Sequence, residues 1–414
     1  MYDRFLTQAV LAALKDTPVV LLQGPRQCGK STLVQSLARG PHRARYITLD
    51  DPVARAAAVA APSDFIAGFT GPVVIDEVQL APEIFRPIKL SVDNNRRPGR
   101  FLLTGSSNIL LSPRLSDSLA GRMEIILLRQ LSQGEISGAR EDFIDMAFGK
   151  KSPPMRPFPP VSRDRIAKVL TAGGYPEVIN RKEPQRREAW FNSYITTILE
   201  RDVRQLAAID GLTQMPRLLS LLAAQTGGLL NVAELSRDLG FAQPTLARYL
   251  TLLQATYLYQ PLPAWSINIH KRLIKREKVY LSDTGLAAHL RNVDAENLAD
   301  PQRNMGALVE SLVGQELRKQ SAWSTVQPRL YYYRTTDGKE VDFVLGGRNG
   351  GIVGVEVKAS LNVKVSELAG LRDLAQTAGN RFIRGIVLYL GREVLPMGPH
   401  ITAMPLAALW TPCL

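Results

Sequence analysis

The sequence has few of the residues that build disulfide frameworks, zinc sites or membrane spans. Among its 414 residues there are two cysteines, Cys28 and Cys413, and four histidines. Two cysteines so far apart exclude a disulfide framework and a CxxC metal site, and the histidines show no metal-ligand or triad spacing. No run approaches the roughly 20 apolar residues of a membrane helix, and the opening segment lacks a basic leader with a long apolar core. We therefore expect a cytoplasmic protein with no membrane partner.

Acidic residues are also scarce relative to basic ones. The chain has 38 Asp and Glu against 51 Lys and Arg, which gives a formal net charge of +13. Its 45% hydrophobic and 21% charged residues predict folded cores rather than disorder. A basic surface favours polyanionic partners, either nucleic acid or nucleotides.

The chain divides into three predicted segments. Short apolar strands alternate with helices in residues 1–150, which is typical of a parallel sheet covered on both faces. A proline-rich stretch at 150–161 predicts a linker or an exposed crossover. Residues 163–253 have helical periodicity, short strand-like runs follow Tyr257, and a helix from Met305 precedes a strand-rich C-terminal part. We predict an α/β protein with a parallel-sheet core at 1–150, a helical segment at 160–300 and an α/β domain at 301–414.

A phosphate-binding loop follows the first predicted strand, at 18–23. It matches GxxxxGK[ST] in full and comprises Gly24, Pro25, Arg26, Gln27, Cys28, Gly29, Lys30 and Ser31, with Thr32 directly after it. The glycines permit close backbone approach, and successive N–H groups at a helix N-terminus converge on phosphates. We expect Lys30 to reach the β- and γ-phosphates of ATP and the Ser31 hydroxyl to ligate Mg²⁺. Cys28 is interpreted as a small filler rather than a redox switch.

Two carboxylates end the strand predicted at 73–75. Asp76 is placed to hold Mg²⁺, usually through water, and Glu77 to polarise the attacking water. A Glu directly after the Asp favours ATP hydrolysis over phosphoryl transfer to a metabolite. The strand predicted at 101–103 is followed by Thr104, Ser106 and Asn108, which we expect near the γ-phosphate. An ordinary strand-to-loop turn is the alternative for these three.

An arginine finger is expected from Arg122, which follows a predicted helix and would reach a neighbouring subunit's nucleotide. Arg114 and Arg129 compete for this role. A surface arginine is the alternative for all three.

These motifs together resemble a known family. GPRQCGKSTL, ITLDDP, VVIDEVQ, LLTGSSN, SLAGR and GGYPEV occur in order, and KREKVYLSDTGL, YYYRTTDGKEVDFVL and VEVKAS extend the match over nearly the whole chain. The set is similar to the prokaryotic AAA-family ATPases that carry a C-terminal DUF4143 domain. The resemblance implies an AAA+ fold, ATP with Mg²⁺, and a homo-oligomeric ring such as a hexamer. Gln79 also matches the family, although the sequence gives it no firm role.

Residues 231–250 predict a helix-turn-helix, with the turn at Gly240 and a shared core of leucines. Four residues of the second helix are expected to face a DNA groove: Gln243, Thr245, Arg248 and Tyr249. Residues 257–280 could form a β-wing, and basic residues outnumber acidic ones across 231–280. The basic residues are Arg237, Arg248, Lys271, Arg272, Lys275, Arg276 and Lys278. We expect DNA contact here, with packing or subunit contact as the alternative.

Carboxylates and a lysine occupy two predicted strands near the C-terminus. Asp342 follows a DG turn, and Glu356 and Lys358 are two apart, so they share one face of their strand. We expect Asp342 and Glu356 to bind a divalent metal beside Lys358, with Glu310 or Glu316 completing the site. The pattern resembles the PD-(D/E)xK nuclease fold, to which DUF4143 domains are considered similar. A charged strand face or a binding platform is the alternative.

We therefore predict an AAA+ ATPase that couples ATP hydrolysis to binding, remodelling or cleavage of DNA. Two alternatives stay open. One is a non-cleaving, ATP-dependent regulatory switch. The other is a protein-remodelling ATPase whose nuclease-like domain is only a binding platform.

Overall fold

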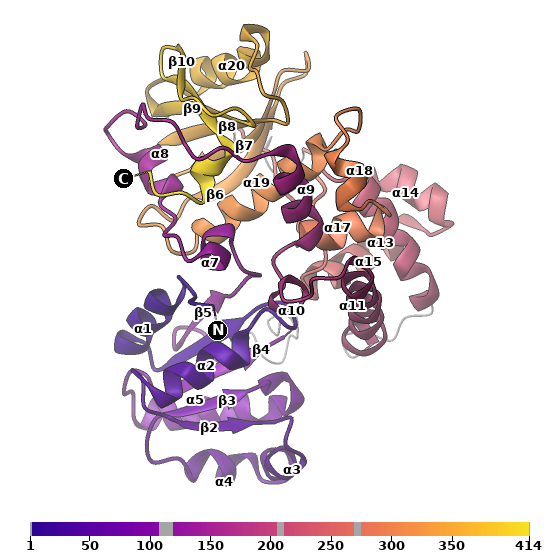
Figure 1. Ribbon diagram of the computed structural model, residues 1–414. Helices are drawn as coiled ribbons and strands as arrows, with labels where there is room; N and C mark the ends of the chain where they lie inside the picture. The colour runs from indigo at the N-terminus through magenta and orange to yellow at the C-terminus, as the bar shows by residue number, and fades with distance from the viewer. Residues whose placement is uncertain (1, 107–118, 205–210, 269–274, 414) are drawn as a thin grey trace. The chain divides into compact units, whose positions relative to one another are not determined.

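The computed structural model describes residues 2–106, 119–204, 211–268 and 275–413 (Figure 1). Its contacts divide the chain into two compact units. The P-loop unit contains Asp3–Leu131 and Ala255–Tyr257, and the C-terminal unit contains Ser132–Gln254 and Leu258–Leu414. This division differs from the predicted segments, because residues 132–150 belong with the C-terminal unit. Within the described residues, no helix combines the length and apolar character needed to span a bilayer.

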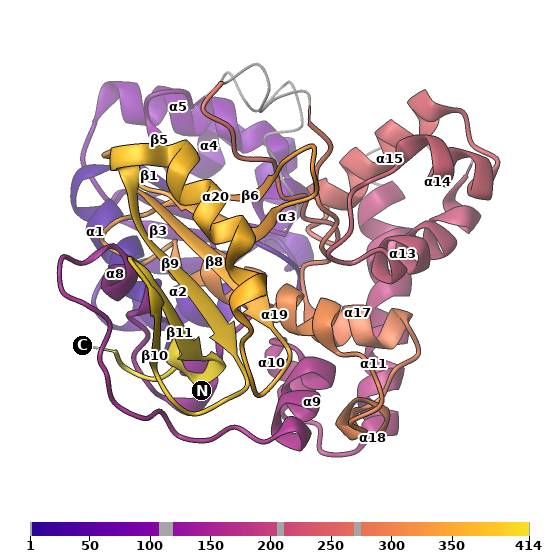
Figure 2. The same cartoon turned by 90° about the horizontal axis from the view of Figure 1, so that it is seen from above.

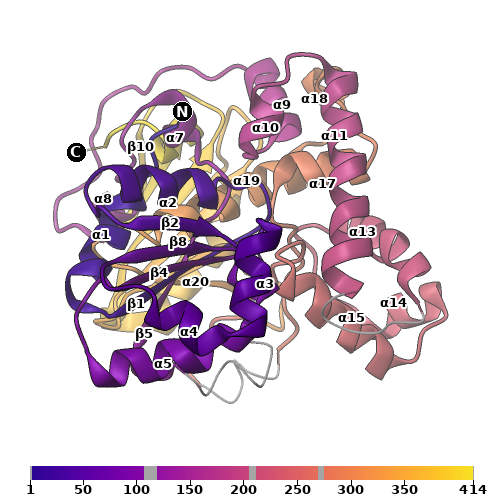
Figure 3. The ribbon, with the colours of Figure 1, turned by 90° about the horizontal axis from the view of Figure 1, so that it is seen from below.

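The P-loop unit is built on a fully parallel sheet in the order β2-β3-β4-β1-β5 (Figure 3). The strands are β1 (Val19–Gln23), β2 (Arg45–Thr48), β3 (Val73–Asp76), β4 (Phe101–Gly105) and β5 (Met123–Leu127). The prediction of a parallel sheet is confirmed, and β1, β3 and β4 are buried along their whole length. The sequence did not indicate β5, because its side chains are mostly exposed or half-buried.

Helices cover both faces of this sheet. They are α1 (Thr7–Asp16), α2 (Lys30–Arg39), α3 (Pro52–Ala60), α4 (Pro62–Ala67) and α5 (Phe85–Asn94). Side chains of α3, α4 and α5 share one core with Leu21, Ile75 and Leu103, while α2 packs against β3 and β4. Because side chains alternate across a strand, a strand covered on both faces is apolar throughout.

The C-terminal unit joins a group of helices to a mixed sheet in the order β10-β11-β9-β8-β7-β6 (Figure 2). The helices that precede this sheet are α7 (Gln133–Ser137), α8 (Phe143–Phe148), α9 (Arg163–Ala172), α10 (Pro176–Ile179), α11 (Pro184–Thr197) with a π-helical extension (Ile198–Val203), α13 (Met215–Ala224), α14 (Val232–Leu239), α15 (Gln243–Ala255), α17 (Thr284–Leu290), α18 (Ala295–Ala299) and α19 (Gly306–Gln320). A helical middle segment is thus confirmed.

The mixed sheet comprises β6 (Arg329–Arg334), β7 (Glu340–Gly346), β8 (Ile352–Lys358), β9 (Phe382–Tyr389), β10 (Leu395–Gly398) and β11 (Ile401–Pro405). Strand β7 is antiparallel to both of its neighbours, β6 and β8, and β9 runs parallel to β8 and β11. Helix α19 packs on β8, and α20 (Ala369–Ala378) packs on β7, β8 and β9. The proline-rich residues 150–161 contain neither helix nor strand, and Arg384 of β9 donates to the carbonyl of Lys151 at 2.8 Å.

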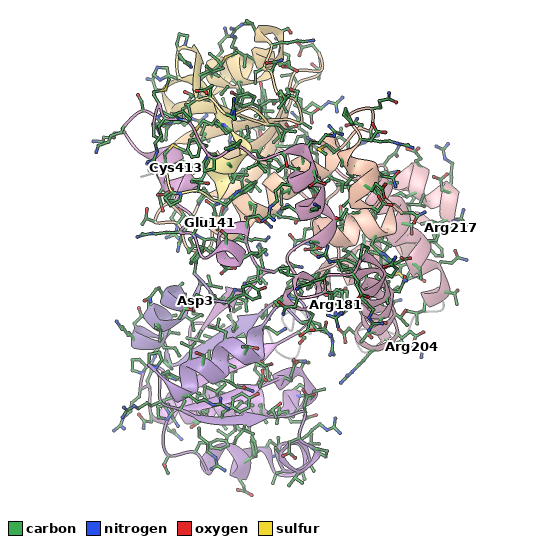
Figure 4. All side chains as sticks on the ribbon, in the orientation of Figure 1. Asp3, Glu141, Arg181, Arg204, Arg217 and Cys413 are labelled. Carbon is green, nitrogen blue, oxygen red and sulfur yellow. The ribbon has the colours of Figure 1, made fainter. Side chains whose placement is uncertain are left out.

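Buried carboxylates hold helix α7 to the C-terminal unit. The Gln133 N–H donates to Glu316 of α19 at 2.9 Å, and the Gly134 N–H donates to Glu141 at 2.6 Å. Glu316 also pairs with Lys319 at 2.8 Å. Figure 4 labels Glu141 in this region. Because the first N–H groups of a helix have no partner within it, their acceptors place residues 132–148 in this unit.

The titration of Glu141 gives a pH test of this arrangement. Burial, together with the charge of Glu316, raises the pKa of Glu141 to about 9. The folded protein therefore keeps the Glu141 proton up to about pH 9, whereas the unfolded chain releases it near the ordinary carboxyl pKa, so stability falls as pH rises between these two values. We expect Glu141→Gln to flatten this fall by up to about 1.4 kcal/mol per pH unit.

The measurement is urea unfolding between pH 5 and 8, followed by tryptophan fluorescence. All four tryptophans, at 190, 265, 323 and 410, lie in the C-terminal unit, so the signal reports that unit alone. The exposed Glu296→Gln serves as the control. Parallel pH profiles for Glu141→Gln and the wild type would contradict the prediction.

Candidate functional site

The phosphate-binding loop leaves β1 and enters α2 with a backbone that glycine alone allows at two positions. Gly24 has φ +154°, and a Cβ there would lie 2.0 Å from the carbonyl oxygen of Leu128. Gly29 has φ +97° and directly precedes α2. Helix α2 therefore begins at Lys30 with its first N–H groups available to a bound anion.

Lys30 is buried in this loop, with 4% of its surface exposed. Its ammonium donates to the carbonyl oxygens of Gly24 at 3.0 Å and Pro25 at 2.8 Å. Among the described residues no carboxylate forms an ion pair with Lys30, so its charge is not neutralised by an acid. A buried cation solvated only by neutral carbonyls fits the negative charge of nucleotide phosphates.

An arginine that the sequence did not indicate supports the loop. The Arg4 guanidinium donates to the carbonyls of Cys28 and Arg129, both at 2.7 Å. The Cys28 side chain is fully buried and lies 3.4 Å from the carbonyl of Leu128. No local pattern connects Arg4 with the loop, because it precedes Cys28 by 24 residues.

Asp76 ends β3 as a buried carboxylate, 2% exposed, that accepts two hydroxyl groups. Tyr46 of β2 donates to one oxygen at 2.7 Å, and Thr104 of β4 donates to the other. Burial and the neighbouring Asp76 raise the pKa of Tyr46 to about 12, so Tyr46 remains a donor at neutral pH. Each carboxylate oxygen keeps further acceptor capacity, which fits Mg²⁺ or its bound water.

Glu77 follows in a left-handed conformation, φ 60°, which is uncommon for a residue other than glycine. Its N–H donates to the Thr104 hydroxyl at 2.9 Å. Its carboxylate accepts from Ser106, 2.9 Å from each oxygen, and from the side-chain amide of Gln79. The structure thus gives Gln79 a contact that explains its presence after the two acids.

Arg122 does not join this site, and Asn108 lies outside the described residues. Arg122 precedes β5, which pairs in parallel with β1 so that Met123 lies beside Val19. Arg122 is therefore at the amino edge of the sheet, whereas the phosphate-binding loop is at the carboxyl edge. Its guanidinium pairs with Asp93 at 2.5 Å.

The predicted helix-turn-helix consists of α14 and α15, joined through Gly240 at φ 69°. Its leucine core is buried and comprises Leu235, Leu239, Leu246, Leu250 and Leu253. Gln243 and Arg248 are exposed, and Thr245 is half-buried. The expectation that Tyr249 faces a groove is wrong, because its ring is buried edge-on against Phe241, with centroids 5.1 Å apart.

In the described part of the predicted β-wing, the strand pairing consists of isolated bridges, including Tyr259 with Leu281 and Leu262 with Lys278. Lys275 and Arg276 are exposed, while Lys271 and Arg272 lie outside the described residues. The expectation that Lys278 adds to a basic DNA surface is wrong, because 2% of its surface is exposed.

Asp342, Glu356 and Lys358 lie on the adjacent strands β7 and β8. Lys358 pairs with Glu356 on β8 at 2.8 Å, and Asp342 of β7 accepts the Val357 N–H at 2.8 Å. The second oxygen of Glu356 is buried and has no hydrogen-bond partner in the described structure. Burial and the charge of Asp342 raise the pKa of Glu356 to about 8 and that of Glu310 to about 7.

Of the two helical glutamates, Glu310 joins this cluster, whereas Glu316 binds α7 and Lys319. The cation beside Glu310 and Asp342 is Lys278. Burial alone would lower the pKa of Lys278, but the surrounding carboxylates raise it well above its ordinary value. Within the described ranges, no three His, Cys, Asp or Glu side chains are arranged to hold a metal ion.

Three family models match this chain in succession. The model described as "AAA domain" matches residues 16–137, and two domains of unknown function, DUF8612 and DUF4143, match residues 163–297 and 305–409. An uncharacterized protein of Mycobacterium tuberculosis and one of Mycobacterium bovis are each 31% identical over 397 residues, covering 95% of this chain and 81% of the relative. An uncharacterized protein of Haemophilus influenzae is 24% identical over 284 residues, covering 66% of this chain and 62% of the relative.

Solved structures show a more distant likeness. The Thermotoga maritima RuvB Holliday junction branch migration motor has a TM-score of 0.32 and 16% identity, covering 63% of this chain and 89% of RuvB. AMPPCP-bound DnaA from Aquifex aeolicus has a TM-score of 0.30 and 13% identity, covering 60% of this chain and 86% of DnaA. At these TM-scores the likeness carries no functional conclusion.

The environment of Lys30 predicts its effect on nucleotide affinity. In Lys30→Ala the phosphates lose their charged donor, so we expect the Kd for Mg-ATP to rise by about 10- to 100-fold. Isothermal titration calorimetry measures this change, and circular dichroism checks that the fold is intact. Lys15→Ala, in the exposed part of α1, is the matched control. Unchanged affinity in Lys30→Ala would remove Lys30 from the site.

Proposed function

This chain belongs to the family of proteins that join an AAA domain to a C-terminal DUF4143 domain, and we propose that it hydrolyses ATP and uses the turnover to bind and remodel DNA. The observation that carries the ATPase proposal is the pair Asp76 and Glu77, held at the carboxyl edge of the sheet that also bears the phosphate-binding loop. An acid placed for a metal and a second acid placed for water are what ATP hydrolysis requires.

The roles follow from the contacts. The loop N–H groups and Lys30 would bind the phosphates, and Ser31 and Asp76 would hold Mg²⁺, which supplies charge neutralisation there. Glu77 would orient the attacking water and accept its proton. Ser106 and Gln79 fix the orientation of the Glu77 carboxylate, so they are positioning residues. Thr104 links Asp76 to the backbone of Glu77, so the two acids are oriented together.

Two variants should lower the rate of ATP hydrolysis while ATP still binds. Glu77→Gln removes the base, so we expect kcat to fall by about 10²- to 10⁴-fold with Mg-ATP still bound. Gln79→Ala leaves the base in place but removes a hydrogen bond that orients its carboxylate. We therefore expect a smaller fall in kcat, with KM nearly unchanged.

Steady-state phosphate release measures both effects, and Gln8→Ala on the exposed face of α1 is the control. A structural role for Gln79 alone would lower the amount of folded protein without changing kcat per active site. If Glu77→Gln turned over ATP at the wild-type rate, the assignment of the base would fail.

Arg122 supports a proposal of action between subunits. Its position at the opposite edge of the sheet from the loop excludes it from this chain's own phosphates. An arginine finger acts on a nucleotide bound by another subunit. We therefore propose a homo-oligomeric ring in which Arg122 reaches the neighbouring nucleotide.

DNA binding is proposed for the second helix of the helix-turn-helix. Gln243 and Arg248 are exposed on α15, and a buried leucine core fixes the helix beneath them. In such motifs the second helix enters the major groove with its N-terminal residues toward the bases. The net charge of +13 favours a polyanionic partner.

The Arg248 proposal predicts a change in salt dependence. If Arg248 meets a phosphate, Arg248→Ala weakens DNA binding across sequences and lowers the slope of log K against log salt by about one. Fluorescence anisotropy with duplex, single-stranded and branched DNA at several salt concentrations measures this. The exposed Lys168→Ala, on α9 of the same unit, is the control. Binding that is unmeasurable or independent of salt would instead favour a protein-remodelling ATPase.

For the C-terminal domain we propose a similarity in fold to PD-(D/E)xK nucleases. Asp342 on β7, Glu356 and Lys358 on β8 and Glu310 on α19 reproduce the order of acids and lysine in the PD-(D/E)xK pattern. These residues do not fit a metal ion as arranged, because Lys278 lies among them. No cleavage step is therefore assigned to this domain.

A further inference from the structure

We propose that the ammonium of Lys278 takes the place of a divalent cation in the carboxylate cluster of the C-terminal domain, so that this domain binds no metal while Lys278 is in position. This proposal goes beyond ATP hydrolysis and DNA binding, and it does not depend on either.

Three carboxylates surround the Lys278 ammonium. It lies 2.9 Å from Glu310 of α19, and 2.5 Å and 3.4 Å from Glu340 and Asp342 of β7. The side chain is 2% exposed. An ammonium has three donors, so three carboxylate partners use its full capacity.

The backbone of Lys278 is fixed as firmly as its side chain. Its N–H donates to the carbonyl of Leu262 at 2.9 Å, and the Leu262 N–H donates to the carbonyl of Lys278 at 3.0 Å. The next residue, Val279, donates to Gly228 at 2.8 Å. Lys278 therefore enters the cluster from a paired segment, whereas a surface lysine would be free to swing into solvent.

The carboxylates are suitable metal ligands, but the Lys278 ammonium occupies the position between them and supplies the positive charge. Carboxylate oxygens are the donors that Mg²⁺ and Mn²⁺ prefer, with Mg²⁺–O distances of about 2.0–2.1 Å. A metal bound by Glu310 and Asp342 would stand against the ammonium, with like charges at contact distance. Removing Lys278 would leave three partly buried carboxylates without their cation, which favours metal binding.

A second observation points to the same place. The second oxygen of Glu356 is buried without a hydrogen-bond partner, although Glu356 is only 7% exposed. Lys358 binds the other oxygen of Glu356, and Arg334 lies 3.4 Å from Glu340. Among the described residues, the cations at ion-pair distance from these acids are Lys278, Lys358 and Arg334, and one oxygen of Glu356 has no hydrogen-bond partner.

With Lys278 among the carboxylates, the domain keeps the nuclease-like arrangement of acids and lysine but binds no metal ion. It then serves as a structural or binding platform for the ATPase. Within the proposed function, this favours DNA remodelling without cleavage.

The test is Mn²⁺ binding to the full-length protein without nucleotide, followed by electron paramagnetic resonance. We expect wild type and Asp342→Asn to bind Mn²⁺ equally weakly, because neither offers an open site. Lys278→Met should gain one Mn²⁺ with at least about tenfold higher affinity. The double variant Lys278→Met with Asp342→Asn should lose it again.

Lys275→Met, three residues earlier and exposed, is the control and should gain nothing. If Lys278→Met does not fold by circular dichroism, Lys278→Met with Glu340→Gln restores the charge balance and is expected to gain the same Mn²⁺. The proposal is overturned if the wild type binds Mn²⁺ in a way that Asp342→Asn abolishes, or cleaves DNA with Mn²⁺. It is also overturned if the folded Lys278 variants gain no Mn²⁺.

Discussion

A charge taken out of water must find its partner inside the protein, and in this chain such partners join elements that are far apart in sequence. Asp76 at the end of β3 is held by hydroxyls from β2 and β4. Glu316 of α19 holds the start of α7 from 183 residues away. Lys278 joins the segment after the helix-turn-helix to α19 and β7. Because an unpaired buried charge costs several kcal/mol, each of these contacts fixes the position of its element.

The parallel sheet uses this constraint to assemble the candidate nucleotide site. Its strands all end at one edge, so the phosphate-binding loop, Asp76 and Thr104 meet there although they are widely separated in the chain. The same geometry places Arg122 at the opposite edge, away from the phosphate-binding loop of its own chain.

The two acidic sites differ in how their carboxylates are neutralised. Around Asp76 and Glu77 the partners are hydroxyls, an amide and a backbone N–H, which hold the acids in place without cancelling their charge. Around Asp342 and Glu310 the partner is an ammonium, which cancels it. Similar residues thus give a site open to a metal in one unit and a closed ion-pair cluster in the other.

The sequence by itself determined the features that depend on neighbouring residues: the loop from Gly24 to Ser31, the acids after β3, the helices on either side of Gly240, and the alternation of strands and helices. Such features are readable because glycine dihedrals, strand burial and helix periodicity act within a few residues. Tertiary structure alone decided that Gln79 holds Glu77, that Arg4 supports the loop, that Tyr249 is buried and that Lys278 fills the acidic cluster. Each of these depends on which distant side chain reaches a given atom, and a linear pattern does not encode that distance.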